Sequence, residues 1–212
     1  MTRTWLIIPV ALFTLTLASS SMALQVGDKA PSFRLLDQFG KLIVNSNLEA
    51  AAMEGRLFGV ANQAAVATTA ALAGTWTGLC VSNLTGSGKN LILHEFGFSQ
   101  TVALSADGAV GLLTCTIAAP ASAVTIVNQK LGGVASVMYA DDGATIVTPV
   151  LQRVFGGGGT LAVTGYGQGP AFVYQAKGSI IVPPGYTIAS YTTKATTASY
   201  IFHLLWEEVD AG

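Results

Sequence analysis

"GSIIVPPGYTIASYTT", residues 178–193, is the stretch of sequence that decides the fold class. Pro184 and Gly185 suit the two central positions of a type II turn, because proline fixes φ at about −65° and glycine tolerates the positive φ that follows. The flanking β-branched and aromatic residues are typical of strands. The sequence therefore predicts a strand that enters the turn over residues 179–182 and a strand that leaves it over 186–192.

Short apolar segments separated by turn residues continue on both sides of this hairpin. Gly, Pro, Asn and Asp mark the breaks between them. Ten candidate strands result, at residues 77–83, 90–104, 111–117, 134–139, 145–150, 160–164, 171–176, 179–182, 186–192 and 199–209. Closely spaced strands without intervening helices predict an all-β fold, an antiparallel, jelly-roll-like β-sandwich over residues 55–212.

The last candidate strand, "SYIFHLLWEEV" at residues 199–209, is apolar on both faces. Alternate residues of a strand point to opposite sides. One side carries Tyr200, Phe202, Leu204 and Trp206. A strand of this kind belongs in the middle of a sheet or against a neighbouring subunit, so these four residues are the candidate interface. On the other side we expect His203 to be a hydrogen-bonded histidine of the core or of an interface.

The composition indicates a protein whose surface is partly covered by another subunit. Charged residues make up 10% of the chain, against about 25% in an average soluble domain. Only seven charged side chains lie between Gly97 and Trp206, which predicts that a neighbouring subunit covers part of the surface. The net charge is −1 and no basic cluster occurs, so binding to nucleic acid is not expected.

Residues 1–23 have the pattern of a secretion signal, with a single Arg3, an apolar run and a small-residue cleavage site that ends at Ala23. We expect a cleaved signal and a secreted, extracellular or virion-surface location. The alternatives are a retained anchor, which is the one case in which membrane contact is expected, and a buried N-terminal helix. Residues 24–54 are predicted to be an arm or linker, with a short helix that starts near Leu48.

Two cysteines, Cys80 and Cys115, lie in strand-like runs. In an oxidising compartment they are a candidate disulfide, and as buried thiols they are ordinary core residues. The loop "NLTGSGKN", residues 83–90, offers Asn83 as a candidate N-glycosylation site. It fails as a Walker phosphate loop at both ends, and we predict a hairpin loop between two strands.

Several motifs of enzyme active sites are incomplete in this sequence. His94 and Glu95 begin an HExxH pattern whose second histidine is missing, and the glycines of residues 155–160 lack dinucleotide-loop spacing. Glu207 and Glu208 face opposite sides of a strand, and the adjacent pair Asp141 and Asp142 predicts a turn. The sequence predicts no catalytic residue, no metal site and no cofactor.

Two resemblances add to these patterns. Residues 24–43 resemble the opening of thioredoxin-like and peroxiredoxin proteins in Val26–Gly27–Asp28, Ala30–Pro31 and Gly40–Lys41, but no redox cysteine follows. Residues 54–209 are similar to uncharacterised β-rich phage and environmental proteins in "TGLCVSN", "GSGKNL" and the closing "WEE". That resemblance implies a structural or virion module, and it brings no catalytic residue.

Two functions from different classes follow. The first is a non-enzymatic structural protein that forms a homo-oligomer, as a virion or extracellular surface component. The second is a secreted binding module for carbohydrate or another surface ligand. Stacking faces for the second would come from Trp76, Tyr166, Tyr174, Tyr186 and Tyr191. A thioredoxin-like redox fragment is the remote alternative.

Overall fold

The computed structural model describes residues 47–102, 104, 106–158 and 171–212, which belong to one compact unit. Within these residues a short helix, α1 (Asn47–Met53), precedes the strands. These are β1 (Leu57–Ala61), β2 (Val66–Thr68), β3 (Thr75–Ser82), β4 (Lys89–Gln100), β5 (Gly108–Pro120), β6 (Val127–Asn128), β7 (Tyr139–Gly158), β8 (Ala171–Val182), β9 (Thr187–Thr192) and β10 (Thr196–Asp210). The all-β fold and the short helix near Leu48 are confirmed.

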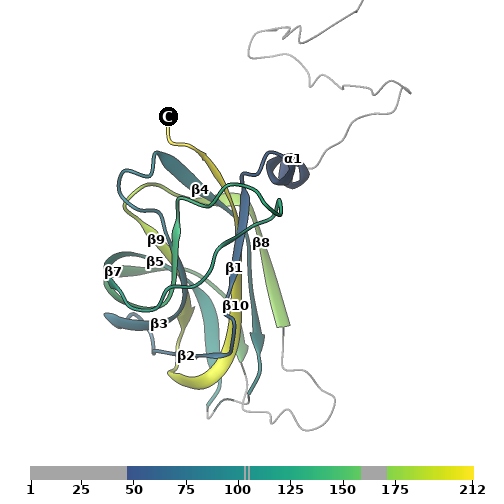
Figure 1. Cartoon of the computed structure of the whole chain (residues 1–212). Helices are drawn as coiled ribbons and strands as arrows, with labels where there is room; N and C mark the ends of the chain where they lie inside the picture. The colour runs from purple at the N-terminus through teal and green to yellow at the C-terminus, as the bar shows by residue number, and fades with distance from the viewer. Residues whose placement is uncertain (1–46, 103, 105, 159–170) are drawn as a thin grey trace, which may run out of the picture. The chain divides into compact units, whose positions relative to one another are not determined.

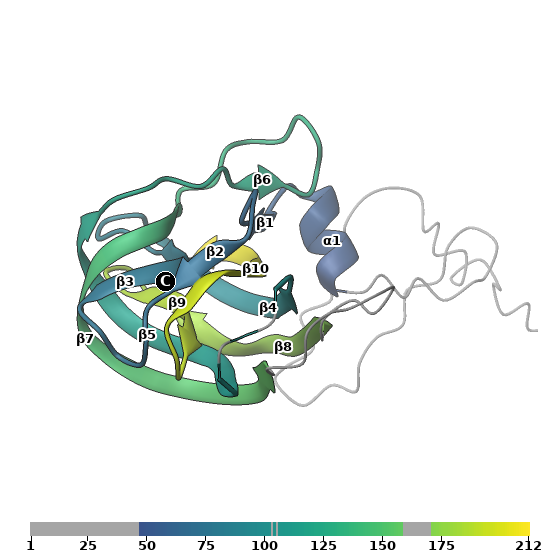
Figure 2. The same cartoon turned by 90° about the horizontal axis from the view of Figure 1, so that it is seen from below.

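The strands form two layers. The large sheet has the order β6-β1-β10-β4-β8, with β2 also paired to β10. In the small sheet, β3, β7, β5 and β9 are hydrogen-bonded in a closed cycle. All pairings within both sheets are antiparallel. Figure 1 shows the large sheet on the right and the small sheet on the left, and Figure 2 shows the same two layers from below. The predicted antiparallel sandwich is therefore confirmed.

The main core fills the space between the two layers and is rich in aromatic side chains. The ring of Phe202 stacks on Phe96 and on Tyr200, with centroids 6.0 Å and 5.5 Å apart. From the small sheet, Leu79 and Leu112 close the core, each fully buried. A buried side chain of this size contributes about 1.5–3 kcal/mol, so these contacts supply much of the stability.

A second, smaller core lies on the other side of the small-sheet strands. Trp76 is 2% exposed there, and its indole Nε1–H donates to the carbonyl of Ser190 at 3.1 Å. Cys80, Leu113 and Ile146 pack around it. Alternate residues of β3 and β5 thus contribute to different cores, which explains why both strands are apolar on both faces.

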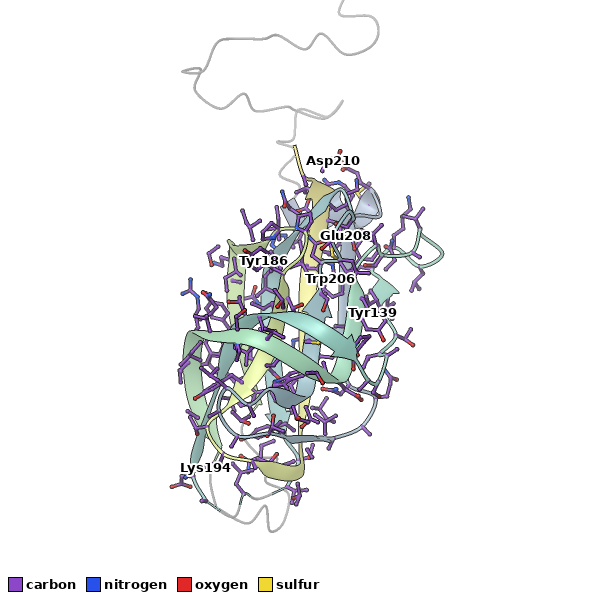
Figure 3. The ribbon with its side chains drawn as sticks, turned by 90° about the vertical axis from the view of Figure 1, so that its left-hand side faces the viewer. Tyr139, Tyr186, Lys194, Trp206, Glu208 and Asp210 are labelled. Carbon is purple, nitrogen blue, oxygen red and sulfur yellow. The ribbon has the colours of Figure 1, made fainter. Side chains whose placement is uncertain are left out.

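β10 lies in the centre of the large sheet, between β1 and β4. This position pairs both edges of β10 within one chain, and one of its two faces lies in the main core. The predicted interface of Tyr200, Phe202, Leu204 and Trp206 is therefore wrong, because all four side chains are at most 1% exposed in the main core. In Figure 3 the labelled Trp206, Glu208 and Asp210 follow one another along the upper part of β10, and strands of the small sheet cross in front of β10 below them.

The turn at residues 183–186 forms as predicted. Gly185 has a φ of +89°, and the N–H of Tyr186 donates to the carbonyl of Pro183 at 3.3 Å. The two strands predicted at 171–176 and 179–182 are one strand, β8, interrupted by Lys177 and Gly178 with φ of +50° and +78°. The strand predicted at 134–139 is wrong, since β7 begins only at Tyr139, and 160–164 lies outside the described residues.

The loop after β3 connects the two sheets and is not the hairpin predicted. β3 belongs to the small sheet and β4 to the large one, so the strands are not neighbours. Asn83 fixes this crossover from inside, with its side-chain amide donating to the carbonyls of Lys89 at 2.7 Å and Val182 at 2.8 Å. Its carbonyl oxygen accepts the hydroxyl of Ser87.

The predicted turn at Asp141 and Asp142 is also wrong, since both residues lie within β7. Asp141 is 0% exposed, and its carboxylate accepts the backbone N–H groups of Ala121, Ser122 and Gly143, each at 2.9 Å. A buried carboxylate is tolerated only when hydrogen bonds satisfy it. Asp141 therefore anchors the end of β5 to β7, a role that the local sequence does not reveal.

Candidate functional site

The outer face of the large sheet carries both histidines of the chain. A β-bulge in β4 lies at His94: Leu93 pairs with Trp206 and Glu95 with Leu205, so that His94 is extra in the ladder. A bulge places two successive residues opposite one. The bulge lies between core residue Leu93 and the outer-face Glu95, and its residue His94 bonds to Glu207 on β10.

His203 and Glu95 form a dyad on this face. The His203 Nε2 lies 2.8 Å from Glu95 Oε1, and the side-chain amide of Gln175 donates to Glu95 Oε2 at 2.5 Å. A Cβ added to Gly97 would lie 2.0 Å from the His203 ring, so the ring rests directly on the glycine. Only glycine permits this position, because any side chain would displace the imidazole. The hydrogen bond expected for His203 is confirmed, but the core position is wrong, because the side chain is 38% exposed on the outer face of the sheet.

A second polar cluster lies further along β10. His94 Nε2 is 3.3 Å from Glu207 Oε2, and the Arg56 guanidinium pairs with the other oxygen of Glu207. Burial lowers the pKa of His94 below its usual value, because the charged imidazolium loses solvation. Glu208, one residue on, faces inward and accepts the hydroxyl of Ser136. The prediction that the two glutamates face opposite sides is confirmed.

A groove of about 430 Å³ opens beside the dyad. The pairing of β1 with β6 ends at Gly59 and Val127, and the groove runs along the gap beyond this pair. Its lining residues come from β1, β4, β10 and the segment around β6. They are Gly59, Val60, Ala61, Gln63, Glu95, Thr125, Val127, Gln129, His203, Leu204 and Leu205.

Among the described lining residues, the groove places a histidine–carboxylate pair beside few other reactive side chains. An imidazole oriented by a carboxylate is half of a catalytic triad. Among the described lining residues, however, Thr125 is the only hydroxyl and no cysteine occurs, so the dyad has no activated nucleophile beside it. In the described part of the chain, no three His, Cys, Asp or Glu side chains are placed to hold a metal ion.

A second surface stands out on the small sheet, at the free edge of β7. β3 pairs with β7 only through Thr145, and the N–H of Ile146 bonds to Gly74 at 2.8 Å. Beyond Ile146 the described strands pair with β7 on one side only, through β5. Thr148, with a φ of +48°, and Pro149 interrupt the edge, and the segment from Val150 to Gly158 then pairs with β5 through register shifts at Gln152 and Phe155.

Both faces of this edge carry exposed apolar side chains. Val150 is directly opposite Thr114 and shares its face, whereas Leu151 is opposite Leu113 and lies on the other face. Val150, Leu151 and Val154 are 55%, 40% and 52% exposed. Monomeric proteins normally protect such an edge with charges, and Arg153 is the only charged residue between Val150 and Gly158.

The other sequence-predicted sites have mixed outcomes. Cys80 and Cys115 are free, buried thiols of the second core, so the structure contains no Cys80–Cys115 disulfide. Burial raises the pKa of Cys115 to about 12 and that of Cys80 well above its usual value. Asn83 is 1% exposed and both its amide protons are engaged, so the folded chain has no room for a glycan there.

The five aromatic residues predicted as stacking faces do not form a platform. Trp76 is in the second core, and Tyr174 stacks on Phe155 with ring centroids 4.5 Å apart. Tyr186 is 53% exposed, whereas Tyr191 packs against the second core. Tyr166 lies outside the described residues.

The N-terminal predictions over residues 1–23 and 24–43 also lie outside the described residues. In the part of the chain that the structure describes, no helix has the length and apolar character needed to span a bilayer. Neither a family model, nor a curated protein, nor a solved structure matches this chain.

Proposed function

We propose that this protein is a non-enzymatic structural component that assembles with copies of itself through the free edge of β7. The observation that carries the proposal is the run from Val150 to Gly158, which is unpaired on one side among the described strands and exposes Val150, Leu151 and Val154. An edge of this kind is a template for another strand. The low charge of the chain supports the same function.

A second copy of the chain is the partner that suits this edge. Two β7 edges can pair antiparallel about a two-fold axis, so that each supplies the hydrogen-bond groups that the other lacks. The edge of β8, at the border of the large sheet, is interrupted near its middle by Lys177 and Gly178, which take left-handed conformations, and it carries Lys177 as an exposed charge. We place the assembly at a cell or virion surface, on the secretion pattern of residues 1–23.

Sedimentation velocity of the purified chain over a range of concentrations tests this function. We expect a concentration-dependent dimer or larger assembly, and we expect the double variant Val150→Lys/Val154→Lys to remain monomeric. The matched control is Ile181→Lys, because Ile181 is 58% exposed on a strand of the other sheet. A wild-type chain that stays monomeric at every concentration, or an Ile181→Lys variant that dissociates equally, would overturn the proposal.

A further inference from the structure

The groove beside His203 and Glu95 lies on the large sheet, whereas the free edge of β7 lies on the small one. Its floor is low because Gly59 and Ala61, both on β1, carry little or no side chain. A Cβ on Gly59 would approach the side-chain amide of Gln129 to 2.8 Å. Glycine at this position therefore keeps the floor open and the amide in place.

The charges in the groove exclude most ionic ligands. None of the described lining residues is Lys or Arg, so a phosphate or carboxylate would find no fixed cation. The carboxylate of Glu95 is the only acidic group in the lining, and both its oxygens already accept hydrogen bonds, from His203 and Gln175. A cationic ligand would have to compete with these partners.

The remaining polar groups are suited to hydroxyls. Gln63 and Gln129 carry amides that both donate and accept, and Thr125 carries a hydroxyl that does the same. His203 uses Nε2 for Glu95, and its Nδ1 has no hydrogen bond to the described residues although the side chain is 38% exposed. If Nε2 donates to Glu95, then Nδ1 is left as an acceptor for a ligand's O–H group.

The groove also has an apolar side. Leu205 and Val127 contribute aliphatic surface, and no aromatic ring lies among the described lining residues. The volume of about 430 Å³ falls in the usual range of about 300–1,000 Å³ for small-molecule sites. Aliphatic surface beside amides and an imidazole matches a pyranose, which has C–H patches and a rim of hydroxyls.

From this combination we propose that the groove binds a neutral saccharide segment. Without an aromatic stacking face the binding is weak, of millimolar order, and it relies on hydrogen bonds. This site is independent of the β7 edge. The two proposals can therefore fail independently. The chain can bind a saccharide without self-associating, or self-associate without binding a saccharide.

Ligand-observed NMR with cellohexaose, xylohexaose and mannohexaose tests the inference, with trigalacturonate and tetra-alanine as an anionic and a peptide probe. We expect saturable binding of at least one neutral oligosaccharide. Gly59→Leu fills the floor and should weaken binding at least tenfold, and His203→Gln should weaken it several-fold. The control Ile181→Thr lies on β8, which contributes no residue to the groove, and should bind like the wild type.

Circular dichroism of each variant identifies any loss of fold. If Gly59→Leu does not fold, His203→Gln decides the result. Absence of binding by all three neutral probes, preferential binding of trigalacturonate or tetra-alanine, or unchanged binding by folded Gly59→Leu would each overturn the inference.

Discussion

Replacement of Asn83 by alanine is expected to destabilise the fold by about 2–4 kcal/mol. The Asn83 amide donates to the buried carbonyl of Val182 and to that of Lys89, at 2.8 Å and 2.7 Å. Alanine leaves both acceptors without this donor, and an unsatisfied buried group costs about 1–3 kcal/mol. Its backbone bonds with Tyr186 and Gly185 remain, so the loss belongs to the side chain alone.

Urea unfolding followed by circular dichroism measures this loss. Leu84→Ala is the matched control, because Leu84 is the next residue along and is 52% exposed; it should change the free energy of unfolding by less than about 0.5 kcal/mol. Asn83→Asp should be at least as destabilising as alanine at pH 7, because a carboxylate oxygen would face two carbonyls. A loss below about 1 kcal/mol for Asn83→Ala, or a wild-type stability for Asn83→Asp, would refute this account of the crossover.

Three further predictions concern buried polar and titratable groups. Asp141→Asn should lower the free energy of unfolding in urea by about 2–3 kcal/mol, because an amide nitrogen cannot accept the backbone N–H groups that bond to the carboxylate. An unchanged urea midpoint would contradict the role of Asp141 as a buried anchor. Because the folded pKa of His94 lies below its unfolded value of about 6.5, the unfolded chain takes up the proton first, and stability should fall as the pH drops below about 6.5. His94→Gln should flatten that slope in unfolding curves at pH 5–7, and an equal slope in wild type and variant would contradict it. Cys80 and Cys115 should resist a thiol reagent at pH 8 in the native state and give two reactive thiols in denaturant without reductant, whereas a disulfide would give none.

The fold was predictable where local chemistry and final structure agree. Pro184 and Gly185 form their turn whatever the rest of the fold, because their φ preferences are local. The alternation of apolar side chains in β10 predicts a strand in the middle of a sheet, whichever strands lie beside it. The sequence did not predict β1, because five residues with a central glycine have a low intrinsic preference for strand. The antiparallel pairing with β10 stabilises the strand instead.

The candidate site was much less predictable, because long-range pairs create it. His203 and Glu95 are separated by 108 positions and meet only because β10 and β4 pair. Strict alternation also gives no sign of the bulge at His94. Similarly, Asp141 and Asn83 have side chains that commonly form turns or carry glycans, and only their tertiary partners show that they are buried anchors.

The wrong interface prediction has a physical cause. Two apolar faces on one strand indicate double coverage, and the sequence cannot show whether the cover comes from the same chain. Here the main core covers one face of β10, and the other face lies partly exposed on the outer side of the large sheet. The edge that exposes apolar side chains and is unpaired among the described strands lies on β7, where the sequence only weakly marks Val150, Leu151 and Val154.

The most direct test of self-association is hydrogen exchange of the β7 segment from Val150 to Gly158 at low and at high protein concentration. If two copies pair along this edge, the amides that do not bond to β5 become protected as concentration rises, and Val150→Lys/Val154→Lys abolishes that protection. Peptides from β10, whose strand is paired on both sides, should show no change. Exchange in β7 that is independent of concentration, in a sample that sedimentation shows to be associated, would contradict the proposed interface.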